Sequence, residues 1–229
     1  MTQEYFEVHT SMTNTVEGSS VTVDVNTARI CENMTNAQFR ILIMKLRDIA
    51  VKMIDVRHGA LLNTWTTEKQ RVKTWFGSED EQIRQMLIDG LPRLKAAMLE
   101  LNPGKFFRFD DEKGQTTSCL PSVDNGNTDA AICKPDSKRR IIYFFPHFCT
   151  SHAAKLDDEN KLKNLIHECT HFTDTFNSDD VAYGYGKALQ IWASMNPTKT
   201  ANNADSIACY ITYQESANLG TDAELYGSK

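Results

Sequence analysis

A chain of 229 residues with 41% hydrophobic and 24% charged residues is long enough to bury one core without depending on disulfides or metals. Its formal net charge of -5 offers no basic surface for nucleic acid, and no stretch is apolar for long enough to cross a bilayer. We therefore expect neither nucleic acid nor a membrane among its partners.

The N-terminal segment, residues 1–35, is rich in Thr, Ser, Val and Asn. Within it, "SSVTVDV" alternates at the period of a half-exposed strand, so we expect an N-terminal extension or edge strand. Residues 36–229 are expected to form the main domain, with a polar tail that frays from about Ser216. The opening "MTQEYFEVHTSMTNT" lacks the basic end and apolar run of a signal peptide.

Two long helices are predicted in the first half of the main domain. Residues 36–63 repeat apolar side chains at intervals of three and four, which predicts one long helix with a buried face. Before the second helical pattern, Ser78 and Glu81 have the spacing of a capping box. Pro92 lies inside this pattern and is expected to kink or divide the helix, which ends near residue 102.

The next segment, residues 105–140, alternates short apolar runs with clusters of Gly, Asp, Asn, Ser and Pro, which indicates a loop-rich hairpin region. Cys119 and Cys133 flank its tip and could cross-link it. The six cysteines form no CxxC pair, so the sequence predicts no cysteine metal site. Two further helices are predicted over residues 181–196 and 203–216.

Between these regions, "NKLKNLIHECTHF" has a helical period, with its apolar residues on one side. His167 and His171 lie nearly opposite that side, one above the other, so that both imidazoles can bind one metal ion. Glu168 lies beside them and can reach a water at the metal, as in the HExxH zinc hydrolases. The alternative is a surface helix with two solvated histidines.

A catalytic zinc ion needs a third protein ligand and an open position for water. The acidic and imidazole side chains near the motif are the candidates: Asp174, Asp179, Asp180, His147 and His152. The residues 177–178 favour a chain reversal that would bring Asp179 or Asp180 back over the ion, whereas Asp174 would lie one turn beyond it.

With these residues in view, "HECTH" at 167–171 followed by "NSDDVAYG" at 177–184 resembles the aspzincin metallopeptidases, the deuterolysin and peptidyl-Lys metalloendopeptidase group. The family pattern is HExxH and then Gly-Thr-x-Asp-x-x-Tyr-Gly, so the resemblance implies that Asp180 is the third zinc ligand. This chain departs from the pattern at Asn177 and Ser178, which replace Gly and Thr. The segments "KTWFGS", "IIYFF" and "NADS" extend the likeness over about residues 40–215.

The resemblance implies an α+β fold, a mostly helical, zincin-like metallopeptidase with a small antiparallel sheet beside the zinc helix. It also implies one Zn²⁺ per chain, bound by His167, His171 and Asp180. Glu168 would take a proton from the attacking water and pass it to the leaving amine, so that the protein is a zinc-dependent endopeptidase acting on protein or peptide substrates.

Two tyrosines are further candidate catalytic residues. The resemblance implies that Tyr143, in the "IIYFF" strand, stabilises the oxyanion, although a tyrosine in an aromatic strand also suits core packing. Tyr183 matches the tyrosine of the motif and is expected to act at the site directly or through a ligand. If "IIYFF" is an exposed edge beside the cleft, an extended substrate can add to it as a strand.

Substrate preference is expected to depend on Asp205. Lysine-specific members of the family place an acid in Asn-Ala-Asp and a Glu three residues later. Asp205 matches the first acid but Ala208 replaces the second, so we expect a weak preference for Lys or Arg on the amine side of the cut. Asp205 could instead cap the following helix, and Glu215 is the acid that could complete the pocket.

The alternative function is a zinc-stabilised binding or effector protein without proteolytic activity, which would close the metal site with His147 or His152. The family is largely secreted, so we expect a secreted or exported protein, and we expect a monomer.

Overall fold

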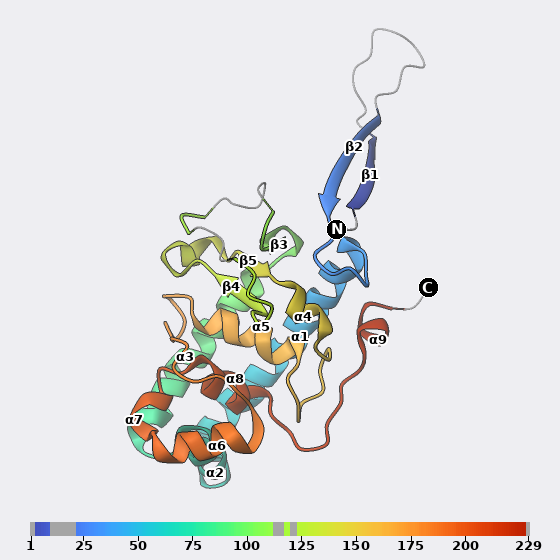
Figure 1. The fold of residues 1–229 in the computed structure, drawn as a ribbon. Coiled ribbons are helices and arrows are strands. Elements are labelled where there is room, and N and C mark those ends of the chain that lie inside the picture. Colours follow the sequence, from blue (N-terminus) through green and yellow to red (C-terminus); the bar gives the residue numbers. More distant parts are fainter. Residues whose placement is uncertain (1–2, 10–21, 112–116, 120–122, 228–229) are drawn as a thin grey trace.

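The computed structural model describes residues 3–9, 22–111, 117–119 and 123–227, and Figure 1 shows a mostly helical body from which a two-stranded hairpin projects. The helices are α1 (Asn36–Asn63), α2 (Trp65–Phe76), α3 (Glu81–Glu100), α4 (Pro146–Thr150), α5 (Lys161–Thr170), α6 (Gly186–Met195), α7 (Pro197–Thr200), α8 (Ala204–Thr212) and α9 (Asp222–Tyr226). The strands are β1 (Gln3–His9), β2 (Thr22–Ala28), β3 (Phe106–Arg108), β4 (Ala130–Ile132) and β5 (Ile142–Phe144), and the short 3₁₀ helices are η1 (Pro103–Lys105) and η2 (Lys134–Arg139). Within the described ranges, no helix is both long enough and apolar enough to span a bilayer.

The long helix α1 confirms the prediction over residues 36–63 and contacts α3, α5, α8 and α9. It begins with a capping box in which the Thr35 hydroxyl accepts the Gln38 N–H and the Gln38 side chain accepts the Thr35 N–H. Its apolar face is buried in the core through Phe39, Leu42, Ile43, Leu46, Ala50, Ile54 and Leu61. This buried face gives α5, the helix that carries the histidines, a rigid support.

Helix α3 runs without interruption through Pro92, so it is not divided there. Its N-cap is Asp80, whose carboxylate accepts the Ile83 N–H at 2.9 Å, and Ser78 donates to Asp80 at 2.7 Å. The capping box predicted for Ser78 is therefore wrong, because a carboxylate two residues later provides an equally good cap.

The three strands β3, β5 and β4 form a mixed sheet in that order. Strand β5 pairs in parallel with β3 and antiparallel with β4. The α+β class is confirmed, but the sheet is not wholly antiparallel, and β3 and β4 do not form the hairpin predicted over 105–140. The interpretation of "IIYFF" as an exposed edge is also wrong, because β5 is central and buried, as a continuous apolar run favours. The edge strand that contacts α5 is β4.

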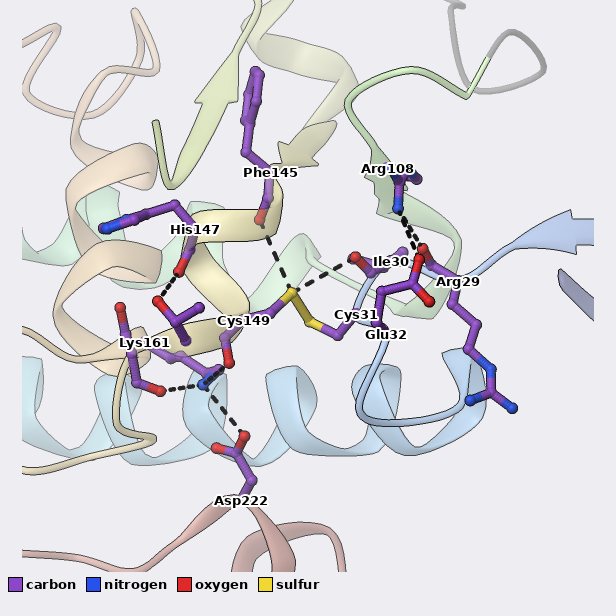
Figure 2. Close-up of a disulfide and its surroundings, with 12 residues drawn as sticks. Arg29, Ile30, Cys31, Glu32, Arg108, Phe145, His147, Cys149, Lys161 and Asp222 are labelled. Atoms are coloured by element: carbon purple, nitrogen blue, oxygen red, sulfur yellow. Dashed lines mark hydrogen bonds and ion pairs between the residues drawn. A yellow bond between two sulfur atoms is a disulfide. The ribbon is translucent and has the colours of Figure 1, made fainter. Parts of the chain in front are cut away.

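Two disulfides fasten the segments around the sheet. Cys119–Cys133 confirms the predicted cross-link and joins the connection between β3 and β4 to the residue that directly follows β4. Cys31–Cys149 joins the segment before α1 to α4 across 118 residues and is shown in Figure 2. The Cys31–Cys149 bond therefore fastens the segment between β2 and α1 to α4, the helix that follows β5.

The C-terminal segment is docked as far as residue 227, which differs from the frayed tail expected from its polarity. Helix α9 begins with a capping box between Thr221 and Glu224 and contacts α1. Asp222 forms an ion pair at 3.2 Å with the fully buried Lys161 of α5. Figure 2 shows that the Lys161 ammonium also reaches the Cys149 carbonyl, so this side chain ties the start of α5 to both α4 and α9.

Candidate metal centre and cleft

The first two candidate ligands lie on the side of helix α5 away from its apolar face, His167 within the helix and His171 at its C-cap. Asn160 caps the helix by accepting the Lys163 N–H at 2.8 Å. The apolar side chains Leu162, Leu165, Ile166 and Cys169 are fully buried and fix the rotation of the helix. His167 and His171 consequently lie side by side, with ring centroids 4.8 Å apart.

Three potential ligand atoms meet at one point. Asp180 Oδ1 lies 3.0 Å from His167 Nε2 and 3.3 Å from His171 Nε2, and the two Nε2 atoms are 3.1 Å apart. Ligands held at 2.0–2.1 Å around a tetrahedral zinc ion lie about 3.4 Å from one another. The three side chains therefore fit zinc, and among the described residues they are the group of three or more that could hold a metal.

The turn after α5 brings Asp180 back over the histidines. Asn177 adopts the left-handed conformation with φ of 54°, which Asn can adopt in place of the Gly of the family pattern. The Ser178 carbonyl accepts the Nδ1–H of His171 at 2.9 Å, and its hydroxyl lies 2.7 Å from the Thr170 hydroxyl. The two departures from the family pattern thus preserve the turn and orient His171.

The start of α8 supports the other side of this loop. The buried Asn203 side chain accepts the Val181 N–H at 3.2 Å and the Ala182 N–H at 2.9 Å. The backbones of Asp179 and Asn203 also pair in an isolated bridge. The "NADS" segment therefore holds the residues on both sides of Asp180, a role that no local sequence pattern reveals.

Asp205 lies behind His167. Its Oδ1 is 2.6 Å from His167 Nδ1 and 2.7 Å from the Lys163 ammonium, and its Oδ2 accepts the Gly184 N–H at 2.7 Å. Such a carboxylate fixes the tautomer and ring orientation of a metal-binding histidine. Asp205 also lines the cleft, although only 1% of its surface is exposed. It does not cap α8, because the N-cap residue is Asn203 and the Asp205 carboxylate contacts His167 instead.

The electrostatics of the three ligands favour a cation between them. Burial lowers the pKa of His167, but hydrogen bonds to Asp180 and Asp205 outweigh it and raise the pKa to about 10. His171 follows the same pattern, since its bond to Asp180 overcomes burial and raises its pKa. Burial alone would raise the pKa of Asp180, yet the two imidazoles hold it well below its usual range. A bound metal ion would replace the protons that these contacts attract.

The other acidic candidates for the third ligand are paired elsewhere. Asp174 forms two bonds of 2.6 Å with Arg140, which anchors the turn after α5 to the segment before β5. Asp179 accepts the Lys134 ammonium at 2.6 Å, and the same ammonium donates to the Ser178 carbonyl at 2.9 Å. Both carboxylates stabilise the turn without facing the histidines.

The two remaining histidine candidates also have other contacts. His147 Nδ1 lies 2.9 Å from Asp129, and His152 lies 3.9 Å from Asp158 with 63% of its side chain exposed. Neither joins the three ligand atoms within the described ranges. Within the described part of the chain, neither histidine therefore offers a fourth ligand to this group.

Two adjoining hollows of about 460 and 230 Å³ flank the ligands. Both are lined by Glu168, Asp180 and Ala130, the last of which belongs to the edge strand β4. Glu168 is 6% exposed, and its Oε1 is 3.9 Å from His167 Nε2. Burial raises the pKa of Glu168. The cleft therefore runs along the edge of β4 and past the Glu168 carboxylate, which is not one of the three candidate metal ligands.

The two candidate tyrosines occupy different places. Tyr183 is 73% exposed, stacks on His167 at 6.3 Å between ring centroids, and bonds through its hydroxyl to Asp180. Burial and the Asp180 carboxylate raise its pKa. Tyr143 is 6% exposed on the central strand, and its hydroxyl lies 2.9 Å from that of Thr117. The structure thus brings Tyr183 to the ligands, whereas Tyr143 lines neither hollow.

Comparisons with known proteins give a consistent family assignment. The model of a family described as lysine-specific metallo-endopeptidase, Aspzincin_M35, matches residues 61–212. An extracellular protease of Aeromonas hydrophila is 27% identical over 137 residues, which are 60% of this chain and 34% of that protein. The chain thus spans about a third of the length of this curated relative.

A solved structure, a zinc peptidase from Grifola frondosa, shares the fold with a TM-score of 0.55 at 19% identity, over 75% of this chain and 92% of that one. The matched region of the family model includes α2 to α8 and every side chain of the metal centre. Since this region is more than half of the chain, the chain belongs to the aspzincin metallopeptidase family.

Proposed function

We propose that the protein is a zinc-dependent endopeptidase with one Zn²⁺ per chain held by His167, His171 and Asp180. The observation that carries this proposal is the convergence of the three ligand atoms within 4.8 Å at the wall of a cleft that Glu168 also lines. A structural zinc site would need a fourth protein ligand and would have no use for Glu168. The proposal therefore favours catalysis over the zinc-stabilised binding protein.

Zinc, when bound, supplies a Lewis acid that polarises the scissile carbonyl and acidifies water. Glu168 takes the proton from the attacking water and delivers it to the leaving amine. Burial raises the pKa of Glu168 and so brings it closer to the working pH. A group whose pKa lies near the working pH can both accept and release a proton. Tyr183, bonded to Asp180, positions that ligand at the mouth of the cleft. The oxyanion role of Tyr143 stays a prediction.

Peptide substrates are proposed to bind along β4. Its residues Ala130 and Ala131 pair with β5 on one side and line the cleft on the other. An extended peptide can add to such an edge through its main chain, largely independently of its side chains. This geometry supports cleavage within a chain and replaces the proposed role of β5 as the docking edge.

A preference for Lys or Arg on the amine side of the cut stays a prediction. It assumed a free Asp205 carboxylate, but both oxygens of Asp205 have partners within the chain. Glu215 is exposed and lines neither hollow, so it offers no second acid there. Any basic preference would have to overcome the contacts that Asp205 already makes.

We further propose that residues 36–229 are the metallopeptidase domain and residues 1–35 an extension, that the protein acts as a monomer, and that it is secreted or exported. Two disulfides support an oxidising compartment, and the Aeromonas relative is described as extracellular.

Glu168→Gln tests the function, with Glu215→Gln as a matched surface control. Wild type and the control should hydrolyse a mixed peptide library, and Glu168→Gln should lose that activity while retaining about one zinc per chain. Undiminished hydrolysis by Glu168→Gln would rule out the proposed base. Absence of hydrolysis by zinc-loaded wild type would favour a binding function.

A further inference from the structure

Lys163 is a buried cation inside the cleft that the proposed mechanism does not use. It lies on α5 one turn before His167, so its side chain is on the same face as the ligands. Only 6% of the side chain is exposed, although the residue lines the larger hollow. Its ammonium is 2.7 Å from Asp205 Oδ1 and 3.1 Å from Glu159 Oε1.

The chain thus places its own ammonium against the carboxylate nearest to the ligand His167. A buried lysine is costly unless it is paired, and the Asp205 carboxylate outweighs burial and raises the pKa of Lys163. Glu159 supplies a second carboxylate to the same ammonium. A third carboxylate that lines the larger hollow, that of Asp129, accepts the Asn164 side chain at 2.8 Å and pairs with His147. Asp205, Glu159 and Asp129 are therefore each matched by a donor of the chain itself.

We propose that Lys163 is a specificity-determining residue, whose stem and ammonium fill the subsite beside Asp205 that would otherwise receive a basic side chain of the substrate. The inference rests on the proposed peptidase function. It follows that the wild-type protein does not select Lys or Arg at this subsite. Shortening Lys163 should leave a cavity lined by Asp205 and Glu159, whose charge and depth suit an alkylammonium group.

Two substitutions separate charge from volume. Lys163→Ala empties the subsite, whereas Lys163→Met keeps it filled with an uncharged chain of similar length. Each variant is compared with wild type on a peptide library, with the cut sites sequenced, and on peptide pairs that differ by Lys against norleucine at the position enriched near the cut. For Lys163→Ala the ratio of kcat/KM for Lys over norleucine should rise at least tenfold, and for wild type and Lys163→Met it should stay within about threefold of one. A wild type that already prefers Lys tenfold, or a Lys163→Ala variant without any gain, would overturn the inference.

A binding measurement tests, without relying on activity, whether Lys163 fills an ammonium subsite. The probe is n-butylammonium chloride, with sodium chloride at equal ionic strength as the reference. It should raise the Tm of Lys163→Ala in a saturable manner and leave wild type and Lys163→Met unchanged. The double variant Lys163→Ala/Asp205→Asn, which lacks the central carboxylate, should lose the response.

The same probe covers a folding defect in Lys163→Ala, which, like Lys163→Met, removes the cation from the buried Asp205 carboxylate. If this variant is unfolded in buffer, butylammonium should restore its native circular dichroism. A variant that stays unfolded at every butylammonium concentration, or that folds without binding the probe, contradicts the inference. If zinc-loaded wild type hydrolyses no peptide, the proposed function fails, while the butylammonium result still decides whether Lys163 fills an ammonium subsite.

Discussion

The contact between Asn203 and the Asp180 loop gives the most quantitative prediction. Asn203→Ala removes the acceptor of two backbone N–H groups, those of Val181 and Ala182, at 3.2 and 2.9 Å. A neutral hydrogen bond contributes about 1 kcal/mol net, so the loop loses about 2 kcal/mol of support. At 1.4 kcal/mol per tenfold change, zinc should bind up to about 30-fold more weakly if all of this energy positions Asp180.

The assay is a competition titration of zinc against a chromophoric chelator, together with urea unfolding of the metal-free protein. The control is Asn202→Ala at the neighbouring position, since the Asn202 side chain is exposed and makes one bond of 2.8 Å to Asp179. The control should bind zinc within about twofold of wild type and change stability by less than about 0.5 kcal/mol. If Asn203→Ala binds zinc as tightly as wild type although its stability falls, the loop does not depend on Asn203 to position Asp180.

Three further predictions follow from the contacts around the site. Asp180→Ala should weaken zinc binding by more than the 10- to 100-fold typical of damage to supporting contacts, whereas Asp174→Ala should retain zinc; metal analysis after dialysis that shows the opposite would make Asp174 the third ligand. Arg140 holds the pKa of Asp174 below its ordinary value of 3.8, so this pair stabilises the protein above about pH 4 and ceases to do so as the pH falls through the lowered pKa. Asp174→Asn should therefore reduce the unfolding free energy at pH 7, with a difference that shrinks below pH 4, and a constant difference would refute the linkage. Replacing Cys31 and Cys149 by Ser should cost about 2–5 kcal/mol in urea unfolding, because the bond closes a loop of 118 residues, and an unchanged midpoint would show that it does not limit the unfolded state.

The zinc helix could be predicted from the sequence because its information is local. Apolar residues at a helical period fix one face of α5, and His167 and His171 at i and i+4 then share the opposite face. The chain reversal after the helix was also predictable from Asn177 and Ser178, which are typical turn residues. Geometry selects Asp180 from the candidates left open because Asp174 and Asp179 are occupied by cations from distant segments.

The features that the sequence did not reveal all depend on contacts between distant segments. The continuous apolar run "IIYFF" favours a buried strand, but the partners that place β5 in the centre come from distant segments, β3 and β4. The Cys31–Cys149 bond connects positions 118 residues apart, and cysteine counting does not identify such a pairing. Asp205 was expected to contact substrate. Its ion pair with Lys163 could not be predicted, because Lys163 lies in α5 and meets Asp205 of α8 only through the packing of these two helices.

The most direct test of the central claim is digestion of a mixed peptide library by the zinc-loaded protein, with and without a chelator, followed by sequencing of the cut sites. The account predicts internal cleavage that a chelator abolishes and that added Zn²⁺ restores at one equivalent per chain. Cleavage that persists after the zinc has been removed, or no cleavage by protein that holds one zinc per chain, would contradict it.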